Sequence, residues 1–90
     1  MGTVDCLRLV GLKCWFYSND HRPPHFHVTK ADKWEIRVFF LNPPASMIEI
    51  VWVAKGGRFA ERNLVYKAVA GKQELLLAEW DKKVCHADKK

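Results

Sequence analysis

The chain has 90 residues, a net charge of +5 and an apolar fraction of 49%. A chain of this length supports one hydrophobic core, so we expect a single domain over residues 1–90. So small a core leaves little room for a deep cavity, which disfavours enzymes that bury a small substrate. The positive charge favours a polyanionic partner, either nucleic acid or an acidic protein, although Lys82, Lys83, Lys89 and Lys90 lie in the tail.

The cysteines and the apolar runs indicate in which cellular compartment the protein is expected. Cys6, Cys14 and Cys85 are an odd number and include no CxxC pair, so neither a disulfide framework nor a cysteine zinc site is indicated. The N-terminal residues lack the cationic start of a secretory signal, and no apolar run is long enough for a membrane span. We therefore expect a cytoplasmic protein without a membrane partner.

The first half of the chain predicts strands. Residues 12–17 form a β-type run, and residues 26–29 form a second one after Pro23-Pro24, whose rings force an extended backbone. Residues 31–33 predict a hairpin turn. Residues 34–40 and 47–53 then alternate, which places three sets of residues each on one face: Trp34, Ile36, Val38 and Phe40; Glu35, Arg37 and Phe39; and Ile48, Ile50 and Trp52.

After Gly56-Gly57 the apolar period changes to that of a helix. Val65, Val69, Leu76, Trp80 and Val84 form one helical stripe, and Gly71 can divide it into two helices. The predicted fold class is α+β, a small antiparallel sheet of about four strands covered by a C-terminal helix or helix pair. Trp34, Trp52 and Trp80 are expected in the core, whereas Trp15, Tyr17 and Lys13 share a face that can be partly exposed.

Histidines are concentrated in one short segment, His21 to His27. If Phe26 lies in a strand, His25 and His27 project from the same face with accessible rings, while Phe26 points into the core. Asn19 and Asp20 can orient an imidazole by hydrogen bonding, and the stiff Pro-Pro step lowers the entropy cost of holding the rings. The cations Arg22 and Lys30 lie nearby in the sequence.

Several interpretations of this segment remain open. His25 and His27 could bind a divalent metal, with Asp20, His21 or Glu35 as the third ligand. Two imidazoles beside a cation could instead cleave RNA without metal, one as general base and the other as general acid. The rings and Arg22 could also bind single-stranded nucleic acid. Finally, the histidines could simply satisfy backbone groups in a rigid turn.

Residues 16–28, FYSNDHRPPHFHV, resemble the signature of the bacterial domain-of-unknown-function 4160 (DUF4160) family: an aromatic residue, Asn-Asp-His, then Pro-Pro-His-x-His. Residues 74–80, ELLLAEW, are similar to the acidic, Leu-rich helix of that family. The family's helix often opens with His-Arg, whereas Lys72 and Gln73 stand at those positions here. Residues 43–59 match poorly.

The resemblance implies a partner and a role. DUF4160 genes commonly lie beside genes of the DUF2442 family, an arrangement that resembles a toxin–antitoxin pair. It implies that this small basic protein is the toxin-like component and that an acidic antitoxin from the adjacent gene is its partner.

We therefore expect a toxin-like component that acts on RNA or translation; if it is an enzyme, we expect a metal-independent ribonuclease. The alternatives are a non-enzymatic nucleic-acid-binding or regulatory module, and a protein-binding subunit. The expected catalytic residues are His21, His25 and His27, and the expected binding residues are Asn19, Asp20, Arg22 and Lys30. No cofactor is expected, with a divalent metal at His25 and His27 left open.

Overall fold

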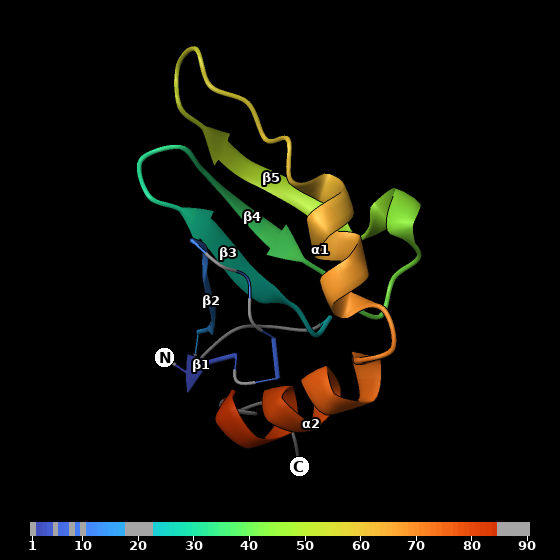
Figure 1. Cartoon of the computed structure of the whole chain (residues 1–90). Helices are drawn as coiled ribbons and strands as arrows, with labels where there is room; N and C mark the ends of the chain where they lie inside the picture. Colours follow the sequence, from blue (N-terminus) through green and yellow to red (C-terminus); the bar gives the residue numbers. More distant parts are fainter. Residues whose placement is uncertain (1, 5, 8, 10, 18–22, 85–90) are drawn as a thin grey trace.

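The computed structural model describes residues 2–4, 6, 7, 9, 11–17 and 23–84. Its strands form one antiparallel sheet in which each strand lies beside its neighbour in the sequence (Figure 1). The strands are Gly2–Thr3 (β1), Lys13–Phe16 (β2), Phe26–Lys30 (β3), Trp34–Val38 (β4) and Ile48–Val53 (β5). A 3₁₀ turn, Pro44–Ser46 (η1), precedes β5, and the helices Arg62–Val69 (α1) and Gln73–Lys83 (α2) follow it.

The predicted α+β class, with an antiparallel sheet and a C-terminal helix pair, is confirmed. The two-residue strand β1, which pairs with the end of β2, was not predicted. The hairpin turn at residues 31–33 was predicted correctly: the Lys33 N–H donates to the Lys30 carbonyl oxygen at 2.8 Å, and Asp32 adopts a φ of 61°. Asp tolerates this left-handed conformation better than most residues.

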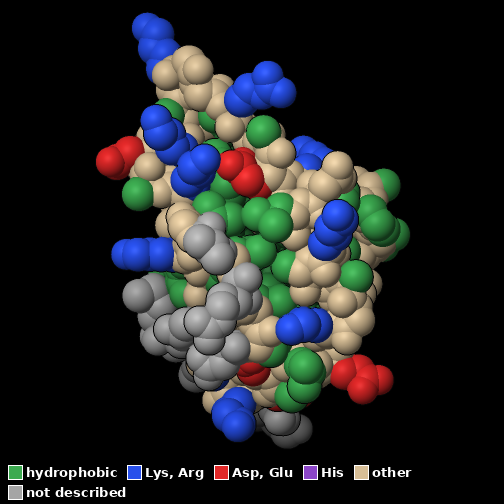
Figure 2. Space-filling model, in the orientation of Figure 1, with side chains coloured by type: hydrophobic (Ala, Val, Ile, Leu, Met, Phe, Trp, Pro, Cys, Tyr) green, Lys and Arg blue, Asp and Glu red, His purple; other side chains and the backbone are tan. Residues whose placement is uncertain are grey.

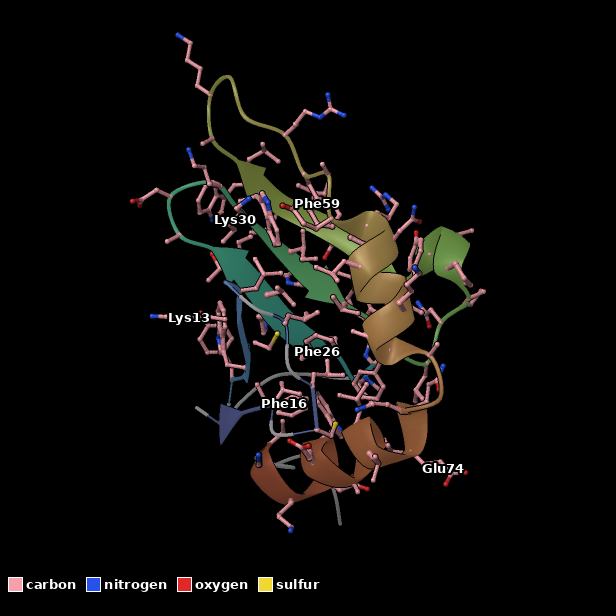
Figure 3. The ribbon with its side chains drawn as sticks, in the orientation of Figure 1. Lys13, Phe16, Phe26, Lys30, Phe59 and Glu74 are labelled. Carbon is pink, nitrogen blue, oxygen red and sulfur yellow. The ribbon has the colours of Figure 1, made fainter. Side chains whose placement is uncertain are left out.

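The sheet has one face turned to the helices, which we call the inner face. Phe16, Phe26, Val28, Ile36 and Val38 lie on it and are buried. Figure 3 shows Phe16 and Phe26 pointing into the space between the sheet and the helices. The loop before α1 covers the same face, because the Phe59 ring packs edge-on against Trp34 with the ring centroids 4.8 Å apart. The core therefore lies between this face and the two helices.

The helical stripe predicted from the sequence is confirmed. Its members Val65, Val69, Leu76, Trp80 and Val84 are all buried. Gly71 does divide the stripe, with a φ of +75° that an L side chain rarely adopts. In Figure 1, α1 crosses in front of the sheet and α2 lies at its lower end. Trp80 reaches Phe16 from α2, with ring centroids 6.3 Å apart.

One tryptophan expected in the core lies at the surface. Trp34 and Trp80 are buried, but Trp52 is 41% exposed. Trp52 pairs with Glu35 across an irregularity in the β4–β5 pairing, and β5 is an edge strand, so even Ile50, which pairs with the buried Ile36, is 45% exposed. The register shift at this β-bulge moves Trp52 off the face that Ile50 occupies. The prediction that Ile48, Ile50 and Trp52 share one face is therefore wrong for Trp52.

Candidate functional site

The two histidines of the Pro-Pro-His-x-His segment lie side by side, and His27 lies on the face of the sheet opposite Phe26. Their ring centroids are 5.1 Å apart, and Phe26 is fully buried on the inner face. The predicted arrangement is confirmed for His27, which lies on the face opposite Phe26 with the His25 ring beside it. His25 precedes β3, and its ring also lies 5.7 Å from that of the buried Trp80 in α2. We call this second face the outer face; Lys13, Trp15, His27, Thr29, Glu35 and Arg37 lie on it by strand register.

The predicted accessibility of the two rings is wrong. His25 is 7% exposed and His27 is 4% exposed. Neighbouring rings cover them: Trp15 stacks on His27 at 5.5 Å between centroids, Tyr17 meets it edge-on at 4.5 Å, and Phe39 lies 4.9 Å from His25. Trp15 lies in β2, and Tyr17 and Phe39 directly follow β2 and β4. Their positions beside the histidines depend on how the strands pair, so the burial of the two rings could not be predicted from the sequence.

The backbone fixes one nitrogen of His25. Its Nδ1 lies 2.8 Å from the carbonyl oxygen of Pro23, which fits an Nδ1–H donating to that oxygen. Because Pro24 follows it, a helical backbone is disfavoured at Pro23, which restricts the direction of its carbonyl group. This contact is of the kind expected if the histidine satisfies a backbone group in a rigid turn. It leaves Nε2 as the acceptor of the neutral ring.

A row of paired residues crosses the outer face at His27. His27 pairs with Trp15 of β2 on one side and with Arg37 of β4 on the other, and Arg37 pairs in turn with Glu49 of β5. The Arg37 Nη1 donates to the Glu49 Oε1 at 2.7 Å, and both side chains are about half exposed. The alternation of residues 34–40 predicted which face of the strand Arg37 occupies. Its position beside His27 could not be predicted, because it depends on the pairing register of β3 and β4.

A carboxylate also approaches His27. The Glu35 Oε2 lies 3.9 Å from the His27 Nδ1, and the Glu35 side chain is partly buried. An imidazole and a carboxylate at this separation, with a guanidinium in the next pair, are the group types that acid–base cleavage of a phosphodiester requires. Of the three third metal ligands considered from the sequence, Glu35 is the one that the described structure brings to His27.

Four of the expected site residues lie outside the described residues: Asn19, Asp20, His21 and Arg22. Their predicted roles stay predictions. Within residues 2–4, 6, 7, 9, 11–17 and 23–84, no group of three His, Cys, Asp or Glu side chains is arranged to hold a metal ion.

Lys30 does not join the two histidines. It lies three residues after His27 in a regular strand, so its side chain projects from the inner face. There its Nζ donates to the Glu61 Oε2 at 3.1 Å. Burial raises the pKa of the Glu61 carboxyl, but the hydrogen bonds from Lys30 and from the Ala60 N–H outweigh it and hold the pKa below its ordinary value. The cation that the structure does place beside His27 is Arg37.

Lys72, which stands where the family often has His, ties the N-terminal segment to α2. Its Nζ donates to the Cys6 carbonyl oxygen at 2.9 Å, and the Cys6 N–H donates to the Glu79 Oε2 at 2.7 Å. In this chain, Lys72 therefore joins the start of α2 to the segment around Cys6, which is distant from it in the sequence.

Residues 11–81 match the family described as Domain of unknown function (DUF4160), which covers most of the chain. The chain belongs to the DUF4160 family. The matched range includes the whole Pro-Pro-His-x-His segment and nearly all of α2, the two parts that carried the resemblance. Neither a curated protein nor a solved structure matches it. The described helices of this DUF4160 member include none long and apolar enough to cross a membrane.

Proposed function

We propose that this chain is the toxin-like component of a two-gene toxin–antitoxin module and that it binds RNA on the outer face of its sheet. The supporting observation is that aromatic rings and cations share this face: Trp15 and the exposed Tyr17 lie near Lys13 and Arg37. Bases of single-stranded RNA stack on such rings, while cations neutralise the phosphates. The toxin role rests on the family membership and the gene arrangement it implies.

On the helix-bearing side of the molecule the positive charges are dispersed, which favours the outer face as the RNA-binding surface. Figure 2 shows the helix-bearing side, where Lys and Arg side chains are scattered over the face and its edges rather than gathered into one patch. Figure 3 shows Lys13 pointing away from the body of the molecule. Arg37 is held by Glu49, so an approaching phosphate would compete with that exposed carboxylate for the guanidinium.

The burial of the histidines favours binding over catalysis. A general acid or base must come within hydrogen-bond distance of the proton that it transfers. His27 is covered by Trp15 and Tyr17, so in this proposal its ring supports the aromatic surface from below. In this proposal the segment acts by stacking rather than by proton transfer.

Metal-independent cleavage of RNA is the second candidate, and the 3.9 Å approach of Glu35 to His27 favours it. His27 and Glu35 would transfer the protons, and Arg37 would stabilise the phosphate charge. For this chemistry the ring of Tyr17 would have to move away from His27 when RNA binds.

The partner in this proposal is an acidic protein encoded by the adjacent gene. The net charge of +5 favours association with an acidic chain, and complementary charge speeds the encounter of two proteins. An antitoxin that covers the outer face would prevent RNA binding by competition.

The experiment is a titration of the protein with a single-stranded oligoribonucleotide of about ten nucleotides, followed by fluorescence anisotropy. Lys13→Ala and Arg37→Gln should each weaken binding and lower the slope of log Kd against log salt by about 0.7. Lys67→Ala and Arg62→Gln remove the same charges from α1 and should leave the slope unchanged.

Equal weakening by all four substitutions would show that net charge alone attracts RNA, and the outer face would then be excluded as the binding surface. Incubation of the RNA with wild-type protein, with and without a chelator, separates binding from cleavage. Cleavage that resists the chelator would select the second candidate.

A further inference from the structure

Strand β5 forms one edge of the sheet, and its exposed side chains are apolar except for that of Glu49. Among the described strands it pairs with β4 alone. Ile50, Val51 and Trp52 are consecutive and are 45%, 41% and 41% exposed. Natural edge strands are commonly protected by Lys or Pro, which discourage pairing with another strand. β5 contains neither, and its only features of this kind are Glu49 and the β-bulge. With six residues, it is long enough to pair with a further strand.

The charges flanking these side chains are of opposite sign. Glu49 precedes Ile50 and has a side chain that is 54% exposed, and the exposed Lys55 lies just beyond the end of β5. In an antiparallel pair, the start of one strand faces the end of the other. If two copies of β5 pair in this way, Glu49 of each copy approaches Lys55 of the other, and the apolar side chains meet between them. The segment is thus complementary to itself.

We propose that β5 is a self-association edge: two copies of this chain pair β5 with β5, antiparallel, across a two-fold axis. The opposite edge of the sheet is β1, which has two residues and offers a second copy few backbone hydrogen bonds. Head-to-tail pairing of β5 with β1 is therefore disfavoured, whereas pairing of β5 with itself closes the assembly at a dimer. Glu49 keeps its contact with Arg37, since a carboxylate accepts from more than one donor.

The first test is the molar mass of the purified full chain in solution, measured by light scattering after size exclusion and by sedimentation over a range of concentrations. The wild type should dimerise. Val51→Lys places two like charges near the axis and should weaken the dimer at least about tenfold. The matched control is Leu75→Lys, a substitution of an exposed leucine on α2, which should leave the dimer unchanged.

The second test exchanges the two charges. Lys55→Glu and Glu49→Lys should each weaken the dimer about fivefold, because each places like charges opposite one another, and the double substitution should restore it. Lys55 lies in an exposed turn, so its substitution leaves the fold intact, which circular dichroism verifies.

A wild type that stays monomeric at the highest attainable concentration would overturn the proposal. So would a dimer that tolerates Val51→Lys, or a double substitution as weak as the single ones. A chain that is monomeric by itself but binds an acidic protein through β5 would assign this edge to a different partner and likewise overturn self-association. Val51→Lys and Lys55→Glu leave the Arg37–Glu49 contact in place, so the dimer measured with these two variants is independent of RNA binding by Lys13 and Arg37, which is measured separately.

Discussion

His27 stacks on Trp15 across the β2–β3 pair, with ring centroids 5.5 Å apart and planes inclined by 21°. The imidazole is therefore part of an aromatic cluster as well as a group that can transfer protons. Removing it changes packing and chemistry together. A substitution that keeps the ring and removes the nitrogens is needed to separate the two contributions.

We expect His27→Ala to lower the free energy of unfolding by about 1–3 kcal/mol, because it opens a cavity under Trp15 and Tyr17. His27→Phe retains a flat ring and should cost less. Urea denaturation followed by circular dichroism measures both values. A His27→Ala protein as stable as the wild type would contradict the packing role.

The same pair of variants addresses toxicity. Induced expression of His27→Phe in a susceptible bacterium should still inhibit growth if the histidine only supports an RNA-binding surface. Loss of inhibition by a folded His27→Phe protein that still binds RNA would instead show that imidazole chemistry is required, since acid–base catalysis contributes roughly 10²- to 10⁴-fold in rate.

Trp34 and Trp52, which lie in neighbouring pairs on one side of the β-bulge, should respond very differently to the same substitution. Trp34→Ala removes a fully buried ring and should cost about 3–5 kcal/mol, whereas Trp52→Ala removes a ring that is 41% exposed and should cost less than about 1 kcal/mol. Thermal unfolding of the two variants provides the comparison. Equal losses would contradict the register shift at Glu35 and Ile36.

Gly71 is expected to be sensitive to substitution for a reason that involves the backbone alone. A Cβ at this position would have no atom within 4 Å, but its φ is +75°. Gly71→Ala should therefore destabilise the fold by about 1 kcal/mol, and Gly71→Asn, which tolerates this conformation, should cost less. Urea midpoints measure the difference, and an Ala variant more stable than the Asn variant would refute the explanation.

Stability at alkaline pH should depend on Cys14. Burial raises the pKa of its thiol from 9.0 to about 11. The folded state thus keeps a proton that the unfolded state loses, so this contribution to stability is complete below pH 9 and is lost as the pH rises toward 11. The decline in the free energy of unfolding over this range should be shallower in Cys14→Ala. Parallel declines for the two proteins would exclude the thiol as the cause.

Much of the fold could be predicted from the sequence because the signals were local. Alternation defined β4, and the helical stripe with Gly71 defined both helices. The placement of Trp52 could not be predicted, because a bulge depends on the pairing of two strands. The same holds for the candidate site: the face on which His27 lies follows from a period of two, but its burial depends on Trp15 and Tyr17, and that of His25 depends on Phe39 and on Trp80 of α2.

Each strand of the sheet lies beside its neighbour in the sequence, so its hairpins can close over short loops. The hydrogen bonds that join the N-terminal segment to α2 span 73 residues from Cys6 to Glu79 and 66 residues from Lys72 to Cys6. Contacts so distant along the chain carry the largest loop-closure entropy. We therefore expect the sheet to assemble first during folding and the two ends of the chain to join last. In the native protein, amide hydrogen exchange should then be fastest at this junction and slowest in β3 and β4.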